Sequence, residues 1–388
     1  MRIPGLAALL VLVAAMPAAA IVMRHDVDAR EYLAGDRRLA AVGQLDTRIE
    51  TVLIADRWAL TAAHAVEMLG PFDAPHVRFG ERCHRVRRVI LHPDWERGWP
   101  HPHEMHDLAL LELELEQAVE GIESIPLYDG TGELGRIVTI AGRGRAGNGR
   151  EGPAAEKDHV LRSGTNRIDA VTATTLFMIF DEPSSATPLE AISGSGDSGG
   201  PAFLDVDGAL HLAGISSATT GVPDLTLSLY GTVDLYTRVS AFSAWIHNVI
   251  SGSAVETEWT SPAPCGRGRW PRHSASRLAE SFFDAWGAGS SAAFEPFYRD
   301  VDDPDERTRK AENVFRNLPE RYGPIEIESC ATLGDREIRV LARTRDGSEW
   351  FSIGLRHAAE KPEEMERLYL KPERPPGAPS RCEESIGR

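Results

Sequence analysis

The chain has 388 residues, more than the roughly 250–300 at which a single hydrophobic core stops growing, so more than one domain is expected. It carries 58 acidic against 42 basic residues, and the net charge of -16 opposes binding to nucleic acid or to an anionic membrane surface. A cluster of four arginines is the feature that most favours nucleic-acid binding. Because valines are interspersed among them, the cluster instead predicts the solvent-exposed face of a strand: Arg82, Arg85, Arg87 and Arg88.

The first twenty residues have the pattern of a secretory signal peptide. Arg2 precedes an apolar stretch from Leu6 to Met16, and Ala18-Ala19-Ala20 fits the small residues before a signal peptidase site. The apolar stretch is shorter than the ~20 residues that a membrane-spanning helix needs, which disfavours an uncleaved anchor. We therefore expect cleavage after Ala20, export to the periplasm or the extracellular space, and no stable membrane insertion.

A histidine and an aspartate follow, each beside a short predicted strand. Strands are expected at Thr51–Ile54 and Trp58–Leu60, and His64 comes directly after the second one. Asp107 stands immediately before the apolar strand predicted at Leu108–Glu114. A base and a carboxylate at strand ends are candidates for a catalytic pair.

The loop before Asp107 is rich in residue types that bind zinc: His101, His103, Glu104 and His106. Their spacing fits no helix face, and two prolines keep the segment irregular. We expect a polar surface loop and no metal site.

A second alternative function is raised by Gly142-Arg143-Gly144-Arg145-Ala146-Gly147, which follows the strand predicted at Arg136–Ala141 and matches GxGxxG. A dinucleotide site requires a helix to open at the last glycine. The following segment, 148–153, contains two glycines and a proline and blocks that helix. An exposed, flexible loop is expected instead, and no cofactor is predicted.

The glycine-dense turn Gly196-Asp197-Ser198-Gly199-Gly200-Pro201 supplies a candidate nucleophile. Glycine tolerates backbone conformations closed to other residues, so the amides of Gly196 and Ser198 can converge beside the Ser198 hydroxyl as an oxyanion hole. A serine nucleophile needs a base and a group that orients the base, and His64 and Asp107 suit these roles. The chain order His, Asp, Ser excludes the α/β-hydrolase and subtilisin arrangements.

Three motifs resemble those of chymotrypsin-like serine peptidases, and their spacing in the chain also resembles that family. They are Thr-Ala-Ala-His ending at His64, Asp-Leu-Ala-Leu beginning at Asp107, and Gly-Asp-Ser-Gly-Gly-Pro around Ser198. Each motif alone is usually an ordinary strand end or turn, but the three together in this order are specific. The resemblance covers residues 21–250 and implies a double β-barrel that ends in a helix.

The resemblance also implies a role for the mature N-terminus. In this family the free amino group of an Ile-Val-Gly-Gly start pairs with the aspartate before the nucleophile, here Ile21 with Asp197. Met23-Arg24 departs from the usual Gly-Gly. Ala65 stands where many relatives have a cysteine, which is consistent with a bacterial-type member.

The substrate pocket is carried over from the family by position. Ile192 is expected at the floor, Ser217 and Thr219 on one wall, and Asp234 on another. An inward Asp234 carboxylate would favour Lys or Arg before the scissile bond. We expect it to point outward, because it would otherwise lack a partner in the empty pocket, and this leaves a small apolar pocket suited to Ala or Val.

The rest of the peptidase region reads as short strands followed by a helix at Val239–Ile246. The other expected strands are Val160–Leu161, Thr175–Phe180, Ala202–Leu204, Leu210–Ser216 and Gly231–Tyr236. Residues 251–272 are rich in Ser, Pro and Gly and predict a linker.

A small α+β accessory domain is expected over residues 273–388. Its predicted helices contain Leu278–Trp286 and Arg307–Tyr322, and strands follow at Ile325–Glu328, Glu337–Leu341 and Trp350–Ile353. The order faintly resembles the nuclear-transport-factor-2-like fold, and nothing in the segment identifies a partner.

The four cysteines permit three pairings. Cys330 and Cys382 lie in one expected domain, so we predict that they pair and that Cys83 pairs with Cys265 by elimination.

These features together predict a mostly β, secreted serine endopeptidase that acts on proteins or peptides without a cofactor. The alternatives are a catalytically silent binding protein on the same scaffold and an esterase that uses the same triad.

Overall fold

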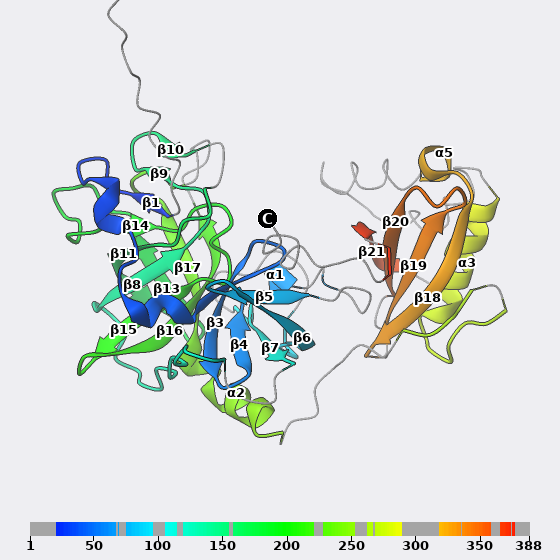
Figure 1. Cartoon of the computed structure of the whole chain (residues 1–388), viewed down its shortest axis with the longest axis horizontal. Coiled ribbons are helices and arrows are strands. Elements are labelled where there is room, and N and C mark those ends of the chain that lie inside the picture. The colour runs from blue at the N-terminus through cyan, green and yellow to red at the C-terminus, as the bar shows by residue number, and fades with distance from the viewer. Residues whose placement is uncertain are drawn as a thin grey trace, which may run out of the picture.

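A computed structural model describes most of the chain. The described residues are 21–66, 69, 75–95, 105–114, 119–154, 158–220, 228–252, 262–266, 268–288, 318–334, 336–357, 365–373 and 375–376. Two bodies of structure can be followed in Figure 1, a β-rich region up to residue 252 and a C-terminal unit drawn in yellow to red.

A closed six-stranded barrel forms the first half of the β-rich region, with strand order β2-β3-β4-β7-β6-β5 (Figure 1). Its elements are β2 (Val42–Leu45), β3 (Glu50–Ala55), β4 (Trp58–Thr61), α1 (Ala63–Val66), β5 (His76–Phe79), β6 (Arg82–Leu91) and β7 (Ala109–Leu113). Every residue of β4 and β7 is buried, because each strand lies between two neighbours and over the core. On β6, exposed Arg82 and Arg85 form ion pairs with Glu120 and Glu114.

The second half is built on a seven-stranded antiparallel sheet in the order β11-β8-β15-β16-β17-β13-β12. Its strands are β8 (Ile137–Gly142), β11 (Arg162–Arg167), β12 (Ala170–Val171), β13 (Thr175–Ile179), β15 (Pro201–Val206), β16 (Ala209–Thr220) and β17 (Val233–Arg238). A smaller sheet joins β10 (Gly152–Pro153), β9 (Gly147–Asn148), β1 (Val22–Met23) and β14 (Ala191–Ile192). The strand Val22–Met23 is therefore held inside this half.

Short helices complete the region. Three 3-10 helices occupy Ala29–Tyr32, Arg37–Ala41 and Val239–Ala241. Helix α2 (Ser243–Ile250) begins later than the sequence predicted and buries Ile246 and Val249 in the core of the first barrel. The predicted double β-barrel with a terminal helix is confirmed, although the strand expected at Val160–Leu161 begins at Arg162.

The C-terminal unit packs helix α3 (Ser276–Gly287) against a four-stranded antiparallel sheet. The remaining elements are α5 (Leu318–Tyr322), β18 (Ile325–Leu333), β19 (Glu337–Thr344), β20 (Trp350–His357) and β21 (Met365–Glu373). The α3 side chains Phe282 and Trp286 join Phe351 and Ile353 in one apolar core. Strand β21 was missed in the sequence, and residues 307–317 of the second expected helix lie outside the described residues.

The predicted cysteine pairing is wrong. Cys265 forms a disulfide with Cys330, and neighbouring Ala263 bridges to Cys330 through backbone hydrogen bonds. Cys83 is also disulfide-bonded, and Cys382 lies outside the described residues. The error has a physical reason: Ala263 and Cys265, assigned to a linker from composition, lie against the C-terminal sheet.

No helix in the described part of the chain is both long and apolar enough to cross a membrane.

Candidate active site

The fold brings His64, Asp107 and Ser198 into one hydrogen-bonded line. His64 lies in α1, just after β4, and its Nδ1 is 2.7 Å from Asp107 Oδ2. Its other ring nitrogen, Nε2, is 3.0 Å from Ser198 Oγ. The imidazole thus contacts a carboxylate on one side and a hydroxyl on the other, which is the geometry that general-base activation of a serine requires.

Asp107 is fully buried and surrounded by donors. Besides the His64 ring, the backbone N–H of His64 donates to Oδ1 at 2.8 Å, and the hydroxyl of Ser217 donates to Oδ2. Thr237 Oγ1 donates to the Asp107 carbonyl at 3.1 Å. A buried carboxylate with this many donors is kept in one orientation, and so is the imidazole that it contacts.

The turn that carries Ser198 is shaped by glycines. Gly196 has φ +98° and Gly199 has φ +78°, backbone values that residues other than glycine rarely adopt. A methyl group on Gly199 would also collide with Thr61 and with the Glu50 carbonyl. Within the described residues, no acceptor is recorded for the amides of Gly196 and Ser198, so both donors remain available beside the Ser198 hydroxyl.

Asp197 turns inward from this turn and is almost fully buried. It accepts hydrogen bonds from Gly144 N at 2.6 Å and Gly194 N at 2.8 Å. The expectation of an exposed, flexible loop at Gly142–Gly147 is therefore wrong: Ala146 is buried, Gly142 ends β8 and Gly147 begins β9.

Ile21, the expected partner of Asp197, is 1% exposed. The adjacent Val22 pairs with Ile192 and with Gly147, so the Ile21-Val22 segment lies inside the second half close to the nucleophile segment.

Of the expected pocket residues, Thr219 and Asp234 contact each other, whereas the Ser217 hydroxyl is bonded to Asp107. The Asp234 side chain is buried and does not point to solvent. It is 1% exposed, and it accepts hydrogen bonds from Ser193 N at 2.8 Å and from Thr219 Oγ1 at 2.9 Å. The predicted outward carboxylate is wrong, because Ser193 N and Thr219 Oγ1 supply donors to the buried carboxyl. Ile192 is fully buried in an apolar cluster with Val22 and Phe180.

Among the described residues, no group of three or more His, Cys, Asp or Glu side chains is placed to hold a metal ion. His101, His103 and Glu104 lie outside the described residues. His106 stacks on His92 at 5.3 Å between ring centroids, next to Phe242.

Three contributors to the site were not recognised in the sequence. Ser217, expected only at the pocket wall, donates to the Asp107 carboxylate, Thr237 donates to the Asp107 carbonyl, and Ser193 N donates to Asp234. Thr237 lies only three residues after Asp234, in Tyr236-Thr237-Arg238-Val239, so its position could be assigned from the same stretch of sequence. The orientation of Ser193 N depends on tertiary structure and has no sequence signal.

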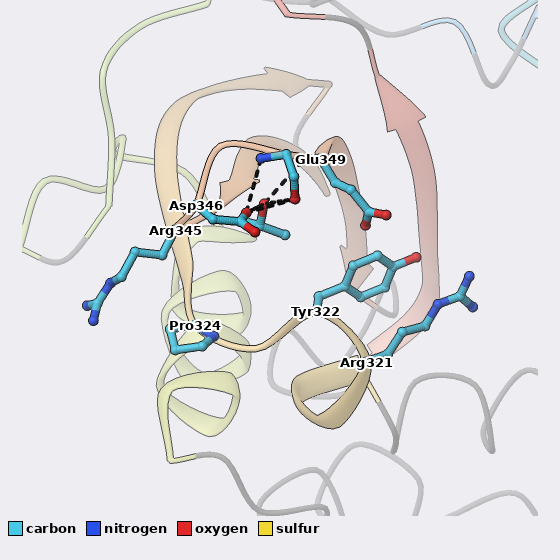
Figure 2. A pocket seen from close by; sticks show the side chains of 8 residues that line it. Arg321, Tyr322, Pro324, Arg345, Asp346 and Glu349 are labelled. Atoms are coloured by element: carbon cyan, nitrogen blue, oxygen red, sulfur yellow. Dashed lines mark hydrogen bonds between the residues drawn. The ribbon is translucent and has the colours of Figure 1, made fainter.

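A separate hollow of about 500 Å³ lies in the C-terminal unit, between α5 and the turn after β19 (Figure 2). Asp346 is engaged by the hydroxyls of Thr344 and Ser348, and the side chains of Arg321 and Arg345 point away from each other. Its charged groups therefore do not converge on a ligand position, in contrast to the His64–Ser198 region.

Comparison with known proteins gives a family match and several relatives. The sequence model of the family described as Trypsin matches residues 31–246, more than half of the chain. Vitamin K-dependent protein C of Oryctolagus cuniculus is 29% identical over 233 residues, covering 55% of this chain and 48% of that protein. Chymotrypsin-like elastase family member 1 of Bos taurus is 24% identical over 218 residues, covering 52% of this chain and 78% of that protein.

A solved structure of neuropsin, a serine protease from mouse brain, aligns with a TM-score of 0.45 at 20% identity, covering 57% of this chain and 99% of that chain. The chain thus spans about half the length of its protein C relative. The family match ends before the C-terminal unit.

The buried Asp234 generates a prediction about stability. Burial raises the pKa of its carboxyl from 3.8 to about 7. The folded state then holds this proton more tightly than the unfolded chain, so stability is lost as pH rises from about 4 to about 7. Asp234→Asn cannot ionise, and its amide can still accept from Ser193 N. We predict that it raises the free energy of unfolding in urea at pH 8, by on the order of 2–4 kcal/mol, and changes it little at pH 4.

Glu133→Gln serves as the control with the opposite sign. Although burial opposes ionisation of Glu133, hydrogen bonds from Arg238 and Ser240 lower its pKa. Replacing its carboxylate should cost stability at pH 8, and this cost should shrink as the pH falls through the lowered pKa of Glu133. Equal stability of wild type and Asp234→Asn at both pH values would contradict the inward, desolvated carboxylate.

Proposed function

Because the chain belongs to the trypsin family of serine proteases, we propose that it is an active serine endopeptidase that uses Ser198, His64 and Asp107. The observation that carries this proposal is the continuous line from Ser198 Oγ through the His64 ring to Asp107, with contacts of 3.0 and 2.7 Å.

In the proposed reaction, Ser198 Oγ attacks the carbonyl carbon of the scissile peptide bond while His64 Nε2 takes its proton. His64 then gives the proton to the leaving amine, and an acyl-enzyme remains on Ser198. Water, activated by His64 in the same way, releases the acid product and restores the serine. Asp107 holds the proton of His64 on Nδ1, which leaves Nε2 free to act as the base.

The negative charge that develops on the carbonyl oxygen would be bound by the amides of Gly196 and Ser198. Preorganised donors of this kind matter because losing one typically costs about 2.7–4 kcal/mol of transition-state stabilisation. The positive φ of Gly196 supports this role, because it orients the turn without steric cost.

We propose that the mature chain begins at Ile21 and that its amino group pairs with Asp197. The burial of Ile21 and the pairing of Val22 with Ile192 support this, since Ile192 lies shortly before Asp197 in the chain. Export by the signal-like residues 1–20 agrees with the disulfide between Cys265 and Cys330, because disulfides persist in oxidising compartments.

The inward Asp234 supports a preference for Lys or Arg before the scissile bond. A carboxyl whose pKa is raised by burial gains from a nearby cation, which restores its charged form. Thr219 Oγ1 donates to Asp234, so its hydroxyl lies beside the carboxyl that would receive the cation.

The C-terminal unit is proposed to be an accessory domain similar to nuclear-transport-factor-2-like folds. Its helix packed on an antiparallel sheet supports this likeness, and we assign it no catalytic role.

The first test is covalent labelling of the exported protein by a fluorophosphonate probe. We predict that wild type is labelled on Ser198 and that Ser198→Ala is not, with a loss of about 10⁴-fold or more in peptide hydrolysis and an unchanged melting temperature. Ser195→Ala is the matched control, because Ser195 is an exposed serine in the same turn, and it should label like wild type. An unlabelled wild type would support the silent binding protein instead.

The second test concerns specificity. We predict that kcat/KM at pH 8 is at least about 10-fold higher for a peptide with Lys before the scissile bond than for the same peptide with norleucine. The ratio should rise through about pH 7 as Asp234 ionises, because the two substrates share all other groups of the enzyme and any common pH dependence cancels in the ratio. Asp234→Asn should abolish both the preference and its pH dependence. A preference for Ala or Val over Lys would restore the small apolar pocket.

A further inference from the structure

A buried ion pair joins the two halves of the peptidase region beneath the nucleophile turn. Arg143 follows β8 in the second half, and Glu50 begins β3 in the first barrel. Arg143 Nη1 is 2.7 Å from Glu50 Oε2, and the Glu50 side chain is fully buried. The backbone N–H of Arg143 also donates to Glu50 Oε1 at 3.1 Å.

The partners of this pair reach the turn itself from both sides. Glu50 N donates to the Ser198 carbonyl at 3.0 Å. On the other side, the residue after Arg143 is Gly144, whose N–H donates to Asp197 Oδ1 at 2.6 Å. The pair therefore closes a ring that runs from the Ser198 carbonyl through Glu50, Arg143 and Gly144 to the Asp197 side chain.

The anchoring of the pair is rigid on both ends. Arg143 Nη2 donates to the Val42 carbonyl at 3.0 Å, and Gln44 Nε2 donates to Glu50 Oε1 at 3.2 Å. Thr61, which lies three residues before His64, donates from its Oγ1 to the Glu50 carbonyl at 2.7 Å. The ring is thus tied to the strand that leads to the histidine.

Stability alone is a poor explanation for such a pair. Burial raises the pKa of Glu50 to about 7 in spite of the Arg143 guanidinium, which means that desolvation outweighs the attraction. Buried ion pairs can often be replaced by apolar residues without loss of stability. Apolar residues could not reproduce the hydrogen bonds that connect the pair to the Ser198 carbonyl and the Asp197 side chain.

We propose that Glu50 and Arg143 are positioning residues for the oxyanion hole. Their ion pair fixes the peptide between Asp197 and Ser198, and so the direction of the Ser198 amide, relative to His64. The inference rests on the proposed peptidase function and adds two residues that contact neither the substrate nor the reacting atoms.

The experiment compares variants of the exported chain at pH 8, with concentrations normalised by fluorophosphonate labelling. We expect Glu50→Gln, which keeps shape and removes charge, to lower kcat about 10- to 100-fold while KM changes less than about 3-fold. A peptidyl trifluoromethyl ketone forms a charged adduct on a competent serine. Its Ki should rise by the same factor as kcat/KM falls, because both depend on oxyanion binding.

Arg143→Met should act like Glu50→Gln, and the double variant should be little worse than either, because the two residues act as a unit. Arg143→Lys keeps the positive charge but loses the forked guanidinium, so its kcat should lie between those of wild type and Arg143→Met. This variant carries the test if Glu50→Gln does not fold. Glu133→Gln is the matched control, because the Arg238–Glu133 pair is equally buried and, within the described residues, makes no hydrogen bond to the nucleophile turn.

The outcomes are separable. If Glu133→Gln loses kcat as much as Glu50→Gln, or if kcat and Ki of Glu50→Gln and Arg143→Lys equal those of wild type, the positioning role is overturned while the peptidase function stands. If wild type neither labels nor hydrolyses peptides, both the function and the positioning role are overturned.

Discussion

The site depends on one buried charge, the Asp107 carboxylate. It receives hydrogen bonds from the His64 ring and backbone in the first barrel and from the Ser217 hydroxyl in the second half. A buried carboxylate that lost these donors would carry a large desolvation cost, so the two halves must meet in the arrangement that supplies them. The orientation of the imidazole toward Ser198 follows from the same contacts. The same hydrogen bonds therefore stabilise the contact between the two halves and orient the imidazole for catalysis.

The nucleophile turn is subject to a second constraint, which is steric. Asp197 must turn inward to Gly144 while Ser198 points to His64, and this reversal depends on glycines at 196 and 199 with positive φ. The turn is packed against Glu50 and Thr61 of the first barrel, with no room for a side chain at 199. Polar contacts from both halves thus converge on Asp197 and Ser198.

Much of this arrangement could be predicted from sequence, because motif order, strand patterns and glycine positions are local features. His64, Asp107 and Ser198 were all expected, and the structure brings them together. The cysteine pairing and the direction of Asp234 could not be predicted, since they depend on which distant segments meet. Cys265 lies in a stretch without periodicity, and the donors to Asp234 come from Ser193 and Thr219, 41 and 15 residues away. The pairing of Glu50 with Arg143 across 93 residues is a similar case.

The most direct measurement is a crystal structure of the protein inactivated by a fluorophosphonate. The account predicts phosphorus bonded to Ser198 Oγ, with the phosphoryl oxygen about 3 Å from the amides of both Gly196 and Ser198. The same structure should keep His64 between the adduct and Asp107. Phosphorus on another residue, or a phosphoryl oxygen turned to solvent away from both amides, would contradict the account.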